Sequence, residues 1–469
     1  MPNVQGINHA GTPSMNTPKI FGPAINRRDF VRSTAAVVGS FTALANPLKT
    51  SAYYSTDDVI RVGLIGCGGR GTGAAAQALS TAQNVRLVAM GDAFRDRLDE
   101  CYGYLTDAAA TDFDPAYVRP RVQVPEEHKF VGFDAYKQVI ALCDVVLIAT
   151  PPGFRPIHFE ASVAAGKHVF MEKPVAVDAP GVRQVLAAAE VAKAKKLNVV
   201  VGLQRHYQAE YREWVERLHA GMIGDIVLSR VYWDSSGVWV RDRAGLEAAA
   251  GRPLTEMEYQ MRNWYYFNWL CGDHICEQHI HNLDVGNWVH QAVPVRAQGK
   301  GGRQVRTGKD HGEIYDHFQV EYEYADGSRM ISSCRHIEGC WSRVSEGFHG
   351  TNGTAPEPGR ILSAKGGVLF QHRGKDDPNP YQVEHDELFD AIANGEYRFE
   401  DATNGANASM TAILGRMAVY SGQMIEWDAA IASTRSIMPT RFAWDAPPPV
   451  LPGPDGYYPI AIPGRTQVL

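Results

Sequence analysis

A glycine-rich turn between two apolar runs constrains the fold more than any other segment of the sequence. Residues 61–92 read RVGLIGCGGRGTGAAAQALSTAQNVRLVAMGD, and the first apolar run is followed at once by Gly66, Gly68 and Gly71. Alanine and leucine then recur at helical spacing, and a second apolar run ends at Asp92. This order predicts a strand, a tight turn, a helix and a second strand, the unit with which a doubly wound parallel sheet begins.

The residue types of this turn suit the binding of a dinucleotide. Gly66 permits a sharp turn, Gly68 lets the backbone approach a pyrophosphate, and Gly71 lets the helix pack closely on the strand. The first N–H groups of the helix and the positive end of its dipole attract phosphates. Asp92 lies about twenty residues past the last glycine, where an acid binds the ribose hydroxyls and repels a 2′-phosphate. The sequence therefore predicts NAD as the cofactor, with NADP as the alternative because Arg95 and Arg97 are close by.

Length and charge limit the classes of function. The chain has 469 residues, enough for two domains with full cores, and 45% of them are hydrophobic, as in an ordinary globular protein. Its formal net charge is -6, so it lacks the basic field of a nucleic-acid-binding protein. The apolar stretch 33–48 is interrupted and too short to span a bilayer, so no membrane span is predicted.

The same apolar stretch is better explained as part of an export signal. It follows Arg27-Arg28 and an apolar residue two places on, and it ends near Ala43-Leu44-Ala45, a small-x-small cleavage pattern. Residues 1–45 are therefore interpreted as a twin-arginine signal, which predicts a periplasmic protein. The alternative is a disordered tail with a chance arginine pair. Because this route exports proteins already folded around a cofactor, the nucleotide is expected to be tightly held.

Three later apolar runs extend the nucleotide-binding unit to residues 58–205. Each predicted strand ends in polar residues, and the carboxyl ends of parallel strands border one cleft. The run 144–149 leads into Thr150-Pro151, 169–171 into Glu172-Lys173-Pro174, and 199–203 toward Arg205 and His206. The candidate cofactor-binding residues come from the turn and these strand ends: Gly66, Gly68, Gly69, Arg70, Gly71, Asp92, Thr150, Pro151, His158, Glu172 and Lys173.

A different pattern begins after residue 205. Residues 319–324 alternate strictly between polar and apolar, and Asp326-Gly327 is a hairpin signal. The fold class is thus α/β, an N-terminal Rossmann-type parallel sheet followed by an α+β domain over 206–440 with an open, mostly antiparallel sheet. One face of that sheet is expected to be free for a partner subunit in a homo-oligomer, a dimer or tetramer. Residues 441–469 form an extended tail.

Two segments carry side chains able to move protons. Lys173 directly follows a buried strand, and an ammonium beside a cationic nicotinamide is expected to have a lowered pKa; a structural pair with Glu172 is the alternative. Read as one helix, 272–288 places Glu277, His281 and Asp284 on one face, and flanking carboxylates suit a histidine that acts as general base. The alternatives are a satisfied structural pair or a metal site formed by His274, Glu277, His279 and His281. No metal is predicted, because the HExxH spacing and paired cysteines are absent.

An aromatic and basic run around Trp239, Arg241 and 262–266 can line a carbohydrate site, since sugar faces stack on indoles and hydroxyls bond to arginine. A core or subunit interface is the equal alternative. The candidate substrate-binding residues are Arg205, His206, Trp264, Tyr265 and Asp284.

In this order, the glycine turn, Glu172-Lys173-Pro174 and the block Glu277-x-x-x-His281-x-x-Asp284 resemble the glucose-fructose oxidoreductase and inositol dehydrogenase (Gfo/Idh/MocA) family. The likeness covers residues 59–430, and 301–304 resembles a secreted, twin-arginine-bearing branch. It implies a Rossmann domain, a sheet domain for substrate binding and oligomerisation, and hydride transfer between nicotinamide C4 and a carbinol carbon of a sugar or cyclitol.

Carried over by motif, Lys173 and His281 are catalytic, and Glu277 stands where the family commonly has aspartate. His279 replaces a usual glycine, so the pocket is expected to be more crowded. The resemblance implies an NAD-dependent oxidoreductase that acts on CH–OH groups of a carbohydrate or polyol. The alternatives are a redox-assisted glycoside hydrolase or lyase that uses a resident NAD, and a nucleotide-holding binding protein without turnover.

Overall fold

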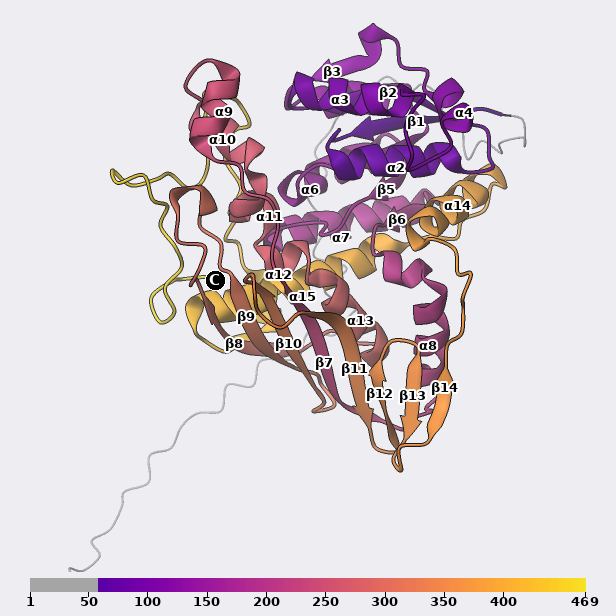
Figure 1. Cartoon of the computed structure of the whole chain (residues 1–469), viewed down its shortest axis with the longest axis vertical. Helices are drawn as coiled ribbons and strands as arrows, with labels where there is room; N and C mark the ends of the chain where they lie inside the picture. The colour runs from indigo at the N-terminus through magenta and orange to yellow at the C-terminus, as the bar shows by residue number, and fades with distance from the viewer. Residues whose placement is uncertain (1–57) are drawn as a thin grey trace, which may run out of the picture. The chain divides into compact units, whose positions relative to one another are not determined.

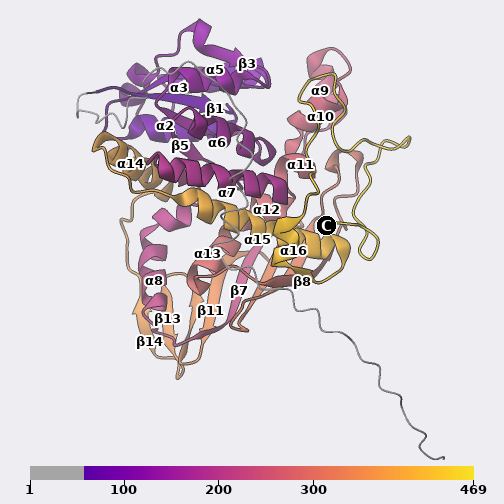
Figure 2. The same cartoon turned by 180° about the vertical axis from the view of Figure 1, so that it is seen from behind.

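The computed structural model describes residues 58–469, and the predicted export signal over 1–45 lies outside them. Two sheets organise the described residues, one of six strands and one of nine. In Figure 1 the six-stranded sheet lies at the top in indigo and magenta, and the long strands of the second sheet lie below it. Figure 2 shows the same two layers from behind, with helices between them.

The first sheet has the strand order β3-β2-β1-β4-β5-β6, and all its pairs are parallel. Such a sheet is buried on both faces, which is why its strands are continuous apolar runs. The helices α5, α6 and α7 cover one face, and α2, α3 and α14 cover the other. The strands are β1 (Ile60–Ile65), β2 (Val85–Asp92), β3 (Lys129–Val131), β4 (Val145–Ile148), β5 (His168–Met171) and β6 (Val199–Val201).

The helices of this layer follow the connections between strands. Those that come before residue 200 are α2 (Gly69–Ser80), α3 (Arg95–Thr106), α4 (Pro115–Val118), α5 (Ala135–Leu142), α6 (Arg155–Ala164) and α7 (Ala179–Ala194). The helix α14 (Pro380–Ala393) comes from much later in the sequence, yet it packs against α2. The chain therefore returns to the first sheet after building the second.

The second sheet has the order β14-β13-β12-β11-β7-β10-β9-β8-β15. Only β7 and β10 pair in parallel among its described strands, so the predicted open, mostly antiparallel sheet is confirmed. The strands are β7 (Ile226–Ser235), β8 (Arg296–Gly302), β9 (His317–Glu323), β10 (Arg329–His336), β11 (Arg343–Gly350), β12 (Gly353–Glu357), β13 (Arg360–Ser363), β14 (Val368–Gln371) and β15 (Ile425–Glu426).

The predicted alternation of β9 sets which face of this sheet is buried. Phe318, Val320 and Tyr322 point into the core, whereas Gln319 between them is exposed. The helix α15 (Asp401–Ser421) packs against β8 and β9 on this face and against α7 of the first layer. Use of the opposite face by a partner subunit stays a prediction.

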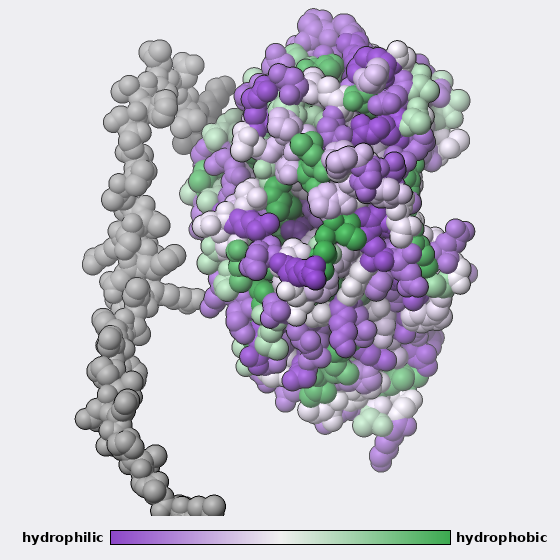
Figure 3. Space-filling view, turned by 90° about the vertical axis from the view of Figure 1, so that its left-hand side faces the viewer, coloured by the Kyte–Doolittle hydropathy of each residue, from purple (hydrophilic) through white to green (hydrophobic). Residues whose placement is uncertain are grey.

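The remaining helices lie around the second sheet: α8 (Ala209–His219), α9 (Arg243–Ala250), α10 (Glu256–Arg262), α11 (Asn268–Cys271), α12 (His274–Glu277), α13 (Ile280–His290) and α16 (Trp427–Ala432). None of the helices between residues 58 and 469 has the length and apolar character needed to cross a membrane. The face seen in Figure 3 is hollowed near its centre, where hydrophobic and hydrophilic side chains alternate around the opening.

The prediction of one continuous helix over 272–288 is wrong. The segment is broken between α12 and α13, where the His279 N–H bonds to the His274 carbonyl instead of closing an ordinary helical turn. The buried His279 ring lies 2.7 Å from Ser332 Oγ on β10, and this contact holds the backbone in the break. The break changes which side chains flank His281.

Candidate active site

A cavity of about 560 Å³ opens where the strands of the first sheet end. Its walls come from the glycine turn, from the ends of β2, β4 and β5, and from the second half of the chain, including Trp233, Trp264, Glu277 and His281. This is the carboxyl edge at which parallel sheets bind ligands. The size suits a small-molecule or cofactor site.

The glycine turn has two kinds of glycine. Gly66 has φ +94°, and a Cβ on Gly71 would lie 1.9 Å from the Gly66 carbonyl oxygen, so both are needed by the turn itself. A Cβ on Gly68 or Gly69 would meet no atom within 4 Å, and both glycines line the cavity. No side chain caps the start of α2, whose first N–H groups are left for a ligand. This open cradle fits the phosphates of NAD.

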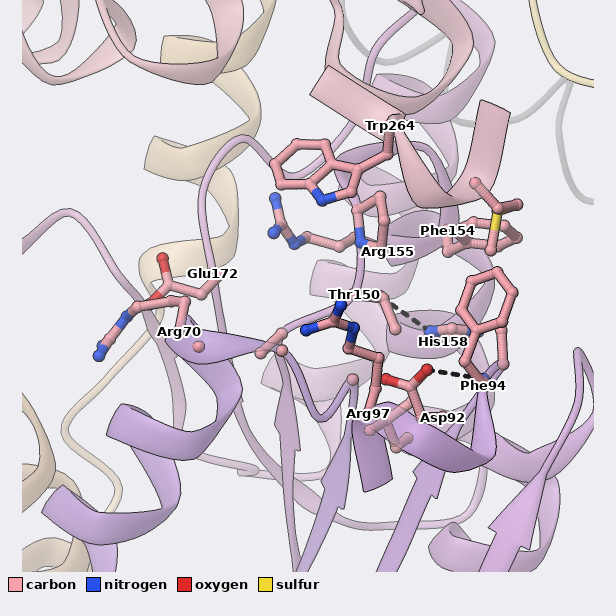
Figure 4. A pocket seen from close by; sticks show the side chains of 18 of the residues that line it. Arg70, Asp92, Phe94, Arg97, Thr150, Phe154, Arg155, His158, Glu172 and Trp264 are labelled. Atoms are coloured by element: carbon pink, nitrogen blue, oxygen red, sulfur yellow. Dashed lines mark hydrogen bonds and ion pairs between the residues drawn. The ribbon is translucent and has the colours of Figure 1, made fainter. Parts of the chain in front are cut away.

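Asp92 is fixed at the end of β2. Its Oδ2 accepts the Cys67 N–H at 2.7 Å, and its Oδ1 accepts the Phe94 N–H at 2.9 Å. Burial raises the pKa of Asp92, and the two N–H donors act against that shift. In Figure 4 the side chain points toward the cavity close to Arg97, so the predicted ribose-binding acid lies at the cavity wall.

Lys173 is held by Glu277 rather than by Glu172. Its Nζ lies 3.2 Å from Glu277 Oε1 and also donates to the Glu277 carbonyl oxygen. Glu172 instead accepts from Arg70, which also reaches Glu384 at 3.2 Å. Burial acts to raise the pKa of Glu172, but the nearby positive charges outweigh it and lower that pKa.

His281 is 6% exposed and faces the cavity with no carboxylate partner. Its Nδ1 has no hydrogen-bond partner in the described part of the chain, and its ring stacks on Trp233 with 5.9 Å between centroids. Burial, and then the charges of Lys173 and Arg205, lower its pKa well below the ordinary value. The imidazole is thus neutral at physiological pH and able to accept a proton.

The expectation that carboxylates flank and orient His281 is wrong. Glu277 is engaged with Lys173, and Asp284 Oδ2 lies 2.8 Å from His206 Nε2. The break before α13 separates Glu277 from His281. Asp284 shares α13 with His281, but its carboxylate bonds to His206 and Asn404 instead.

Two further candidates form a pair on the cavity wall. Thr150 Oγ1 and His158 Nδ1 lie 3.2 Å apart, as Figure 4 shows. Burial lowers the pKa of His158 to about 3, so this ring is neutral. Pro151 lines the same wall.

Only Trp264 of the five candidate substrate-binding residues lines the cavity; Arg205, His206, Tyr265 and Asp284 do not. Arg205 is buried in an ion pair with Glu346, which also accepts from Tyr211 at 2.8 Å. The turn after β6 directs these polar groups into the second half of the chain, where they satisfy one another. Sequence patterns carry no signal for that direction.

The sequence analysis missed Arg155 and Gln278, which line the cavity. Arg155 follows β4, which ends at Ile148, but it carries no motif, so no sequence signal singled it out. Within residues 58–469 no three His, Cys, Asp or Glu side chains gather as metal ligands. Of the histidines in the alternative metal site, His274 lies 2.9 Å from Asp273, and His279 bonds to Ser332.

Comparison with known proteins identifies the first domain. Residues 60–203 match the model of the Gfo/Idh/MocA oxidoreductase family, NAD-binding Rossmann fold. Inositol 2-dehydrogenase of Cereibacter sphaeroides (strain ATCC 17023) is 26% identical over 363 residues, which cover 75% of this chain and 92% of that protein. These matches confirm the predicted NAD-binding domain.

Solved structures share the fold over most of the described chain. Scyllo-inositol dehydrogenase of Lactobacillus casei, with bound NAD(H) and scyllo-inositol, aligns with a TM-score of 0.56 and 20% identity over 79% of this chain and 100% of that one. Aldose-aldose oxidoreductase of Caulobacter crescentus, complexed with glycerol, aligns with a TM-score of 0.58 and 16% identity over 79% and 100%. The predicted two-domain fold class is thereby confirmed.

Proposed function

We propose that this chain, which belongs to the Gfo/Idh/MocA family of NAD-dependent oxidoreductases acting on CH–OH groups, oxidises a carbinol carbon of a sugar, sugar derivative or cyclitol. One observation carries the proposal. Lys173 and the neutral His281 line the same cavity as the uncapped glycine turn and Asp92. A proton acceptor and a hydride acceptor are therefore brought to one substrate.

The chemistry divides between the cofactor and the side chains. NAD, when bound, supplies the hydride acceptor. His281 takes the hydroxyl proton as general base, because its ring is neutral and lines the cavity. Lys173, fixed by Glu277, donates a hydrogen bond to the same oxygen and stabilises the negative charge that develops there.

We propose that the cofactor stays bound between turnovers. Phe94, Phe133 and Phe154 line the cavity, and Trp444 near the end of the chain packs on Phe94 and Phe133, with 5.1 and 4.6 Å between centroids. Arg262 also bridges from α10 to Asp96 at 2.9 Å. These contacts hold α10 and the segment around Trp444 across the part of the cavity in which NAD is expected.

The experiment that tests the function follows absorbance at 340 nm while NAD-loaded protein is mixed with inositols, aldoses and sugar acids. At least one polyol should produce NADH, and His281→Ala should abolish this signal with NAD still bound. No NADH from any polyol, or full activity in His281→Ala, would overturn the proposal. Release of an aglycone without lasting absorbance would favour the redox-assisted glycosidase.

Export and assembly are proposed from the sequence. We propose that the twin-arginine signal places the folded enzyme in the periplasm and that it works as a homo-oligomer, a dimer or tetramer. Replacing Arg27 and Arg28 by lysine should leave the protein in the cytoplasmic fraction. Native mass spectrometry of the exported protein should show more than one subunit with NAD retained; a monomer would exclude the oligomer.

A further inference from the structure

Arg155 is a buried cation that the mechanism does not use. It is the first residue of α6, it is 4% exposed, and it lines the cavity. Its Nη1 donates to the Pro174 carbonyl, but its Nε has no hydrogen-bond partner among residues 58–469. Buried polar groups are nearly always paired, so an orphaned N–H at a cavity wall points to a ligand.

The two carboxylates whose charges act on Arg155 already form ion pairs with other residues. Glu172 and Glu277 are the carboxylates that act on its pKa, yet Glu172 pairs with Arg70 and Glu277 with Lys173. Burial lowers the pKa of Arg155 to about 10, which still leaves the guanidinium charged at neutral pH. A buried charge without its own counter-ion is costly, and an anion in the cavity would remove that cost.

We propose that Arg155 binds a carboxylate of the substrate, so that the enzyme prefers acidic sugar derivatives such as uronates or aldonates over neutral sugars. This inference rests on the proposed function, since it places the acid beside Lys173 and His281. A planar guanidinium suits the purpose because it can bind both oxygens of a carboxylate with two parallel hydrogen bonds.

The position of Arg155 favours the substrate over the cofactor as the source of the anion. Its hydrogen bond to Pro174 lies one residue from Lys173, at the catalytic end of the cavity. Figure 4 shows the side chain extending beneath Trp264 toward the side on which Glu172 lies. The phosphates have a separate cradle at the start of α2. The charges that act on Arg241 are those of Arg97, Arg262, Glu100 and Asp96, a different set from the one around Arg155.

The test compares kcat/KM for glucuronate and glucose in NAD-loaded enzyme. Wild type should prefer glucuronate at least tenfold, and Arg155→Gln should lose about 10- to 100-fold of that preference, as expected when a charged hydrogen bond is removed. Arg155→Lys keeps the charge without the fork and should restore part of it. Arg241→Gln removes a cation from the same cavity and should keep the ratio, whatever its effect on rate.

Two equilibrium measurements separate the explanations. Quenching of tryptophan fluorescence should show glucuronate binding to NAD-loaded His281→Ala and its loss when Arg155→Gln is added. Calorimetric titration should give the same NAD dissociation constant with and without Arg155→Gln. The inference would be overturned if Arg155→Gln left the glucuronate-to-glucose ratio of kcat/KM unchanged, or if both arginine variants lowered this ratio equally. It would also be overturned if Arg155→Gln weakened NAD affinity tenfold without changing the ratio. If no polyol reduces NAD while glucuronate still binds through Arg155, the proposed oxidation fails but carboxylate binding by Arg155 stands.

Discussion

His281 is neutral because of its burial and the charges around it. Burial and the positive charges of Lys173, Arg205 and Arg70 disfavour the protonated ring and keep it neutral. Lys173 has the complementary environment, since Glu277 contacts it through both a carboxylate and a backbone oxygen. His281 is thus a neutral imidazole in the cavity, and Lys173 is a hydrogen-bond donor whose position Glu277 fixes.

Replacing Lys173 by methionine should lower kcat by about 100-fold or more, because the donor to the reacting oxygen is lost while the side-chain volume is kept. NAD affinity, measured by calorimetry, should change little. The control is Lys137→Met on the exposed surface, where an ion pair with Asp134 is removed without effect on turnover. Wild-type activity in Lys173→Met would remove this lysine from the reaction.

At this scale the sequence predicted which chemistry-bearing residues follow buried strands, so Lys173, Asp92 and Thr150 were placed at the cavity correctly. It failed where direction depends on packing. Asp284 was expected beside His281, but its carboxylate bonds to His206 and Asn404, which come from distant parts of the chain. Arg155 carries no motif, and only its burial without an acid partner distinguishes it.

Among the elements, the glycine turn has the least tolerance for change. The N–H groups of α2 can face the cavity only because Gly71 approaches the Gly66 carbonyl so closely. A side chain added at Gly71, inside the turn, should therefore have a different effect from one added at Gly69, which faces the cavity.

Two alanine variants of the turn should behave differently. Gly71→Ala would force a methyl group against backbone and should lower the free energy of unfolding by about 3 kcal/mol or prevent folding. Gly69→Ala meets no atom, so its unfolding free energy should stay within about 0.5 kcal/mol of wild type while NAD binds more weakly. Chemical denaturation and calorimetric titration measure the two effects. Equal stability of both variants would contradict the assigned geometry.

The Arg205–Glu346 pair joins the turn after β6 to β11 inside the protein. Glu346→Ala would leave the buried guanidinium unpaired and should lower the unfolding free energy by about 3 to 5 kcal/mol. Glu323→Ala, which breaks a partly exposed pair with Arg296, is the control and should cost at most about 1 kcal/mol. Similar losses of unfolding free energy in both variants would show that the buried Arg205–Glu346 pair contributes no more to stability than the partly exposed pair.

The strands and helices themselves were largely predictable. A continuous apolar run indicates a strand buried on both faces, and strict alternation indicates a strand buried on one face. The break between α12 and α13 was not predictable, since it depends on the contact of His279 with Ser332, more than fifty positions further along the chain. A local pattern cannot contain that contact.

Over the whole molecule, several buried histidines make stability depend on pH. Burial lowers the pKa of His158 and His279 to about 3 and that of His168 and His290 to about 4. The unfolded chain, with an ordinary value near 6.5, therefore takes up protons that the folded state excludes. Stability should be full above pH ~6.5 and should fall as the pH decreases toward 4.

Denaturation midpoints between pH 7.5 and 5 at constant ionic strength measure this effect. The unfolding free energy should decrease by more than about 1.4 kcal/mol per pH unit below pH 6, the slope of one proton. Buried carboxylates act in the opposite direction: burial raises the pKa of Glu313 to about 7 and raises the pKa of Glu384 well above its ordinary value. The four buried histidines still set the sign of the expected slope. His290→Asn should reduce the slope, and stability that rises on acidification would contradict the account.

The overall plan, a parallel sheet followed by a mostly antiparallel one, could be predicted because each sheet has its own apolar period. The return of α14 and α15 to the first layer could not, because helical periodicity shows that a helix has a buried face without showing what covers it.

The packing of Trp444 on Phe94 and Phe133 joins segments separated by most of the chain. During synthesis on the ribosome, the first sheet can form long before residue 444 has emerged. The nucleotide can therefore reach its half-built pocket while translation continues, and it becomes enclosed only when the last segment folds down. We therefore expect the cofactor to bind before the segment around Trp444 has folded into place.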